Sequence, residues 1–137
     1  MVFINNPNYD SEKEKKIAQV MAYANGTEHY HRVSAIPNAP VATDGVVEVA
    51  KIAGCFWLLD AIIRYQVHKA VMNKAMQVWR LEHVENSQYC LCCTDGNYET
   101  LISQTIEYSD FPLDEITLWV MPGGPQGLKV ILLPSEH

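Results

Sequence analysis

The chain has 137 residues, 48% of them hydrophobic, so it is long enough to bury one core and too short for two ordinary domains. Its 10 basic and 16 acidic residues give a net charge of −6, which argues against sequence-independent nucleic-acid binding, because Lys and Arg supply most of that affinity. We therefore predict a single domain over residues 1–137, with an acidic surface that suits basic partners.

Neither a membrane segment nor an export signal is expected. The longest apolar run, residues 53–63, ends well short of the roughly 20 residues that a bilayer requires. The N-terminus lacks the basic and extended apolar regions of a signal peptide. Three of the four cysteines fall within residues 90–93, where neighbours on a strand point to opposite faces and cannot pair. We expect a soluble cytoplasmic protein with reduced thiols.

Three helices are predicted in the first half of the chain, over about residues 11–25, 44–53 and 55–72. Ser11 and Glu14 have the spacing of a capping box at the start of the first helix. Thr43 or Asp44 is the expected N-cap of the second, and Gly54 ends it. The third is apolar around most of its circumference, which is typical of a central helix.

The hydrophobic period changes from about 3.6 to 2 near residue 76, which indicates strands. Turn signals at residues 85–87, 95–97 and 122–125 separate the alternating runs. Five strands are predicted, over about residues 76–84, 88–94, 100–108, 115–121 and 128–133. Because every connection is short, we expect an antiparallel meander with the helices on one face, an α+β fold.

The third predicted helix contains an unusual acid. Asp60 interrupts the most apolar run of the chain, close to Trp57, which we expect to fill the layer between helices and sheet. A buried, unpaired carboxylate would cost several kcal/mol, so Asp60 needs a partner. That partner either fixes the packing of the helix or belongs to an active site.

A histidine pair offers one route to chemistry. His29 and His31 point the same way if residues 27–33 are extended, and two imidazoles suit a metal ion or a general base. With Asp60 orienting one imidazole, a catalytic dyad would form. No Ser or Cys lies in a nucleophile elbow, so a triad would lack its nucleophile. The alternative is a structural role, in which Asp60 caps a backbone group or pairs with a histidine or arginine to fix the packing.

Two further groups carry weaker signals. Cys90 and Cys92 share a strand face, and with His83 from the preceding strand they would offer zinc three ligands and an open fourth position. The spacing matches no standard zinc motif, and buried cysteines also serve as small hydrophobes. Glu107 and Asp110 flank a strand end, where they could act as an acid/base pair or form an ordinary turn.

The fourth predicted strand presents a candidate contact surface. Trp119 and Met121 share one face with Thr117, opposite to the apolar Ile116, Leu118 and Val120. If solvent reaches that second face, Trp119 and Met121 form an apolar patch suited to a protein partner or a homodimer. The alternative is that both faces of the sheet are covered.

Five segments together resemble a known family of small bacterial single-domain proteins catalogued as a domain of unknown function. They are residues 26–32 (GTEHYHR), 43–45 (TDG), 54–62 (GCFWLLDAI), 104–113 (QTIEYSDFPL) and 132–136 (LLPSE). The resemblance covers about residues 20–137 and leaves residues 1–10 unmatched. It implies no activity, cofactor or catalytic residue, but it implies an accessory role, on plasmids or phages, that includes counter-defence.

Two functions remain open from the sequence. The first is a non-enzymatic binding protein that uses Trp119 and Met121 or its acidic surface, with no cofactor. The second is a hydrolase-like or metal-dependent enzyme built on His29, His31 and Asp60, with Glu107 as a further candidate. An enzyme predicts a concave pocket where these side chains converge, whereas a binder predicts a flat apolar patch.

Overall fold

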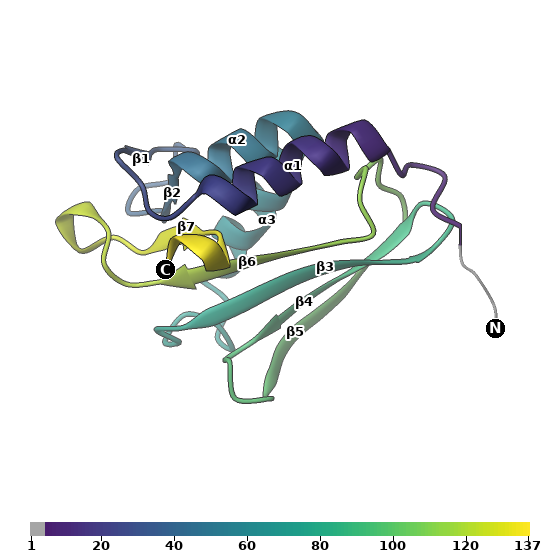
Figure 1. Cartoon of the computed structure of the whole chain (residues 1–137). Helices are drawn as coiled ribbons and strands as arrows, with labels where there is room; N and C mark the ends of the chain where they lie inside the picture. The colour runs from purple at the N-terminus through teal and green to yellow at the C-terminus, as the bar shows by residue number, and fades with distance from the viewer. Residues whose placement is uncertain (1–4) are drawn as a thin grey trace.

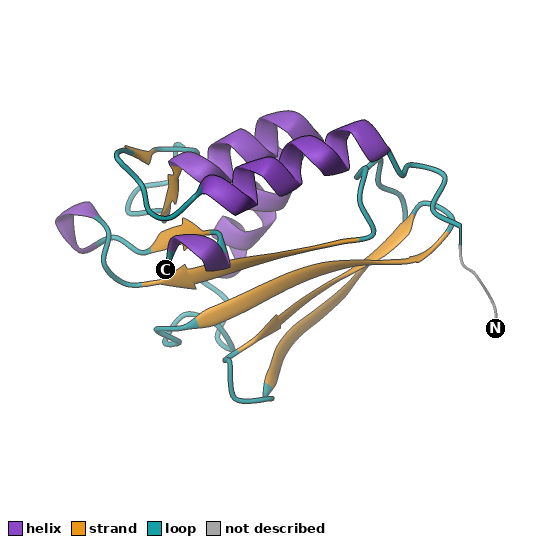
Figure 2. Ribbon diagram, in the orientation of Figure 1, coloured by secondary structure: helices purple, strands orange, loops and turns teal. Residues whose placement is uncertain are grey.

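The computed structural model describes residues 5–137 and confirms an α+β fold, in which three helices lie on one side of a seven-stranded sheet (Figures 1 and 2). The start of the N-terminal segment, to which the signal-peptide prediction applies, lies outside the described residues. Within residues 5–137, no helix combines the length and the apolar character needed to cross a membrane.

The helices are α1 (Ser11–Tyr23), α2 (Asp44–Ala53) and α3 (Phe56–Tyr65), and two short 3-10 helices follow late in the chain, η1 (Pro125–Gly127) and η2 (Pro134–Glu136). The first two α-helices agree with the prediction. The third ends at Tyr65 and not near residue 72, because the chain leaves the helix in successive short turns. In these turns the amide of His68 donates to Tyr65, and the amide of Val71 donates to His68.

Side-chain caps fix where the helices begin. Asp10, not the predicted Ser11, caps α1, and its carboxylate accepts the amides of Glu12 and Lys13 at 3.0 and 3.2 Å. Thr43, one of the two predicted N-caps, caps α2, with Oγ1 accepting the amide of Val46 at 3.3 Å. The cap on α2 also determines where the following Asp44 side chain lies.

The strands are β1 (Tyr30–His31), β2 (Val41–Thr43), β3 (Gln77–Glu85), β4 (Gln88–Thr94), β5 (Thr100–Ile106), β6 (Glu115–Met121) and β7 (Val130–Leu132). Their order in the sheet is β1-β2-β7-β6-β3-β4-β5. The prediction of five strands was therefore too low, since β1 and β2 are too short to show a hydrophobic period.

The predicted meander was also wrong, because β6 pairs with β3 and not with β5, and β2 pairs with β7 in parallel. The segment after β5 crosses the end of the β3–β4 hairpin. Backbone bonds hold this crossing: the amide of Ser109 donates to Ser87, and the amide of His83 donates to Asp114. The crossing places β5 at one edge of the sheet.

The main core lies between the helices and the inner sheet face. Strands β3 and β4 contribute alternate residues to this core, among them Trp79 and Leu91, which are at most 1% exposed. Trp57, expected at the centre of the layer, is only half-buried at its rim. The large aromatic residues that are fully buried include Trp79, Tyr89 and Phe111.

Candidate functional site

The two histidines of the predicted active site converge on Asp44, not on Asp60. His31 Nε2 lies 2.6 Å from Asp44 Oδ1, and His29 Nδ1 lies 3.9 Å from the same oxygen. Pairing of β1 with β2 places His31 opposite Ala42, two residues before Asp44. The short β1 strand thus brings both imidazoles to the first residue of α2.

Asp44 also holds the loop that carries the histidines. Its Oδ2 accepts the backbone amides of Glu28 at 3.0 Å and His29 at 3.3 Å. The hydrogen bond from His31 lowers the pKa of the Asp44 carboxyl most, and the amide of Glu28 lowers it further, so that it falls from 3.8 to about 2. The carboxylate is therefore a permanent negative anchor at neutral pH.

A buried carboxylate lies on the other side of the same helix start. Glu136 Oε1 accepts the Thr43 hydroxyl at 2.6 Å and the Leu133 amide at 2.9 Å, and Oε2 accepts the Gly45 amide at 3.3 Å. These bonds tie η2 to the N-terminus of α2, where a negative charge is favourable. No local sequence pattern singles out Glu136, although residues 26–32, 43–45 and 132–136 are three of the five segments of the family resemblance.

Acid should weaken the anchor at Asp44. Because its folded pKa lies below the ordinary 3.8, its carboxylate contributes stability in full above about pH 4 and loses it as the pH falls toward 2. We expect the stability difference between wild type and Asp44→Asn to shrink over that interval, measured by urea unfolding from pH 2 to 6. The variant His31→Leu should raise the pKa of Asp44 in an NMR titration; an unchanged titration would contradict the assignment.

Asp60 is exposed, which corrects the prediction of a buried acid. Its side chain is 50% exposed and accepts Arg64 Nε at 2.7 Å, an i,i+4 ion pair on the helix surface. Phe56, which is 44% exposed, lies one turn before it on the same stripe of α3. Asp60 is therefore part of the solvent-facing stripe and is not paired with either histidine.

The three expected zinc ligands do not come together. Cys90 and Cys92 share the outer sheet face, with their sulfurs 3.2 Å apart, whereas His83 pairs with the inward-facing Tyr89 and packs against its ring. Within residues 5–137, no group of three or more His, Cys, Asp and Glu side chains is arranged to hold a metal ion. Burial raises the pKa of Cys93 to about 12, which keeps that thiol protonated.

Glu107 and Asp110 lie in an ordinary turn after β5. Glu107 accepts Gln88 Nε2 at 3.3 Å, and Asp110 is exposed. The turn is held by Ser109, whose Oγ accepts the amide of Phe111 at 3.1 Å. The two carboxylates therefore lie at the surface, beside the free end of the β5 edge.

The outer face of the sheet carries a second apolar cluster, which includes two residues of β6. Trp119 and Met121 are half-buried there, around the more buried Val130 and Leu132, and the Trp119 ring packs against His137 at 5.6 Å. The other members of this outer-face cluster are Val41 and Leu128. Figure 2 shows the three α-helices on the opposite side of the sheet.

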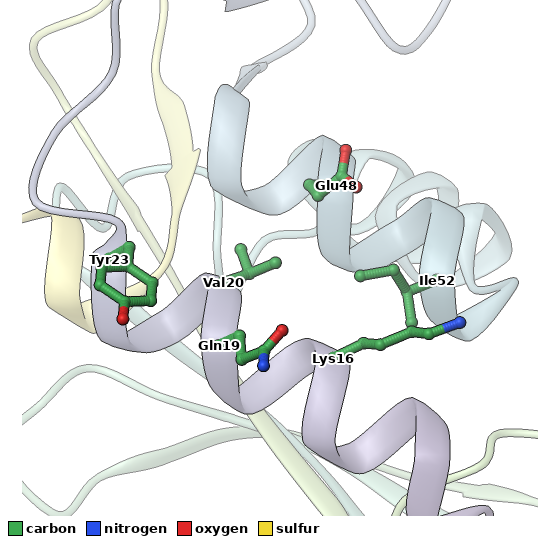
Figure 3. Close-up of a pocket in the computed structure, with 6 residues that line it drawn as sticks. All are labelled: Lys16, Gln19, Val20, Tyr23, Glu48 and Ile52. Atoms are coloured by element: carbon green, nitrogen blue, oxygen red, sulfur yellow. The ribbon is translucent and has the colours of Figure 1, made fainter.

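A hollow of about 520 Å³ lies between α1 and α2 (Figure 3). Val20 and Ile52 face each other across it, and the Lys16 side chain reaches from α1 toward Ile52. Its lining includes one acid, Glu48, and no histidine or cysteine. Its charged lining residues are Lys16 from α1 and Glu48 from α2.

The comparisons with known proteins give a family and no function. Neither a curated protein nor a solved structure matches this chain. Residues 15–137 match a family described as Family of unknown function (DUF6876). This match covers all five segments of the family resemblance, from residue 26 to residue 136. The chain belongs to the family DUF6876, a family of unknown function.

Proposed function

We propose that this chain is a small, non-enzymatic protein-binding or regulatory protein that uses the outer-face cluster around Trp119 and Met121. The observation that carries the proposal is the position of this cluster on the outer sheet face. The three α-helices lie on the other side of the sheet (Figure 2). Aromatic and Met side chains are enriched at protein interfaces, and an apolar patch on an otherwise polar face is typical of a contact surface.

The partner is another protein or a second copy of this chain. The net charge of −6 favours a basic partner and opposes nucleic acid. The four free cysteines support a reducing compartment, the bacterial cytoplasm. An accessory role on a phage or plasmid, including counter-defence, rests on the family resemblance alone.

The His31–Asp44 contact favours the alternative, a hydrolase-like or metal-dependent enzyme. Two observations speak against it. The Thr27 hydroxyl beside the pair donates to the His29 carbonyl at 2.5 Å and accepts the Asp44 amide, so it serves the local backbone. Asp44 likewise binds two amides of the loop. These hydrogen bonds hold the loop against the start of α2, which is a structural role.

The experiment uses Met121→Glu in the full chain, because Met121 is half-buried at the end of β6. Self-association is measured by analytical ultracentrifugation, and a tagged chain is used to recover partners from the native host. We expect one complex, whose affinity falls at least tenfold in the variant because a charge then enters an apolar contact.

Thr117→Glu is the matched control, since Thr117 lies on the same strand and face but beside Arg80, outside the cluster. It should bind as the wild type does. A monomer without a partner, or a partner that both variants bind equally, would contradict the proposal.

A further inference from the structure

The edge strand β5 has unpaired backbone groups. In the part of the chain that the structure describes, β5 pairs with β4 alone and ends the sheet. Residues 100–106 contain no Lys, Arg, Asp, Glu or Pro, the residues that protect natural edge strands. A bulge affects the start of the strand, but pairing is regular from Ile102 to Ile106. Such an edge is a template for one more strand.

Two hollows lie between helix α3 and this edge. Near the C-terminal end of α3, a hollow of about 420 Å³ lies between Tyr65 and Gln104. Near its N-terminal end, a hollow of about 240 Å³ lies between Trp57 and Ile106. Gln104 and Ile106 are two residues apart, roughly 7 Å along the strand. That is the spacing of alternate side chains on an added strand.

Exposed apolar side chains line both hollows, and the charged or ionisable lining residues are Arg64 and His68 in the first and Asp110 in the second. Val67 is 80% exposed in the first, and Tyr108 is 78% exposed in the second. At the first hollow, the Tyr65 hydroxyl donates to Gln104 Oε1 at 2.5 Å, which links the helix to the strand. The groove therefore offers two apolar subsites at a set separation.

The charges at the end of β5 distinguish two possible occupants of the groove, a second copy of this chain and a segment of another protein. Glu107 and Asp110 are both exposed at the C-terminal end of β5, so a basic residue is favoured there. A second copy pairing with the whole strand about a two-fold axis at Ser103 would place its Glu107 opposite Glu99. Like charges in that position are destabilising. The edge thus favours a basic segment of another protein over self-pairing.

We infer that α3 and β5 form a docking groove for an extended, basic peptide segment of another protein, which adds to the sheet as a strand beside β5. Its backbone satisfies the free edge of β5, and alternate apolar side chains enter the two hollows. A Lys or Arg at one end contacts Glu107 and Asp110. This groove lies at the opposite end of the strand order from β7 and β2, so it is independent of the outer-face cluster.

The test selects binders to the native full-length chain from a random nine-residue peptide library displayed on phage. We expect peptides with alternating apolar residues and a basic end, and we expect amide NMR shifts confined to α3, β5 and residues 107–110. Methylating alternate backbone nitrogens of the selected peptide should abolish binding for one set of positions and spare the other, because only one edge of a strand faces β5.

The double variant Glu107→Lys with Asp110→Lys should lower the affinity for the selected peptide at least tenfold. The matched control, Glu12→Lys with Glu48→Lys, makes the same charge change at exposed positions of α1 and α2 and should stay within twofold. A library that yields no binder, a binder that shifts other amides, or equal effects of both N-methylated sets would overturn the inference. None of these outcomes depends on Met121.

Discussion

Replacing Glu136 with Ala is expected to lower the free energy of unfolding by about 3 kcal/mol. The buried carboxylate accepts hydrogen bonds from the Thr43 hydroxyl and from two backbone amides, those of Gly45 and Leu133. Hydrogen bonds to charged groups contribute about 1.5–3 kcal/mol each, and unsatisfied buried donors are costly, although such terms do not add simply. Urea unfolding followed by far-UV circular dichroism would measure the loss.

Two companion variants make the test specific. Glu136→Gln keeps one acceptor oxygen but turns an amide donor toward the Gly45 N–H. The free energy of unfolding should therefore fall by about half as much as in Glu136→Ala. Ser135→Ala changes the exposed neighbouring residue and should leave stability within about 0.5 kcal/mol of wild type. If Glu136→Ala lowers the free energy of unfolding no more than Ser135→Ala does, the hydrogen bonds of Glu136 between η2 and α2 do not stabilise the protein.

The hydrogen bonds of Glu136 to the start of α2 could not be predicted from the sequence, because they join residues far apart in the chain. Local signals predicted α2 well, because its cap at Thr43 and its stop at Gly54 lie within a few residues of the helix. Nothing local indicates that residue 136 returns to residue 43. The same limit hid the parallel pairing of β2 with β7, since a three-residue strand shows no periodicity.

Asp60 has the partner that was expected of it, but its expected burial was wrong, although the sequence carried a signal of exposure. Arg64 follows Asp60 by four residues, the spacing of a helical ion pair, and the two define a solvent-facing stripe. The apolar composition of the segment outweighed this periodicity in the prediction. At the candidate site, His29 and His31 lie 3.9 and 2.6 Å from Asp44 Oδ1, whereas the interpretation of the sequence joined one of them to Asp60.

The outer face was the most predictable part of a candidate surface. Alternation alone placed Trp119 and Met121 opposite Leu118 and Val120, and the burial along β6 follows that alternation. The free edge of β5 was not predictable, because the expected meander would have covered it with the strand that instead pairs with β3. Strand order depends on long-range packing and not on local pattern.

The substitution Gly45→Ala tests the contacts of Glu136 from the side of α2. A Cβ atom there would lie 2.8 Å from Glu136 Oε2 and 2.9 Å from Leu133 Cδ1. Helix propensity alone favours Ala over Gly by about 1 kcal/mol. Overpacking costs about 1–3 kcal/mol, and the hydrogen bonds of Glu136 prevent its carboxylate from moving away. The two terms leave a net loss of about 0–2 kcal/mol, and because both contacts would be shorter than 3.0 Å we expect Gly45→Ala to lower the free energy of unfolding by about 1–2 kcal/mol.

The control and the double variant decide whether the clash is the cause. Gly26→Ala, where a Cβ atom would meet nothing within 4 Å, should be neutral or slightly stabilising. In the Glu136→Ala background the obstructing carboxylate is gone, so adding Gly45→Ala should cost less than it does alone, a coupling of at least 1 kcal/mol in the double-mutant cycle. If the losses in the free energy of unfolding were strictly additive, the cost of Gly45→Ala would not depend on Glu136. The contact between the two residues would then not be the cause of that cost.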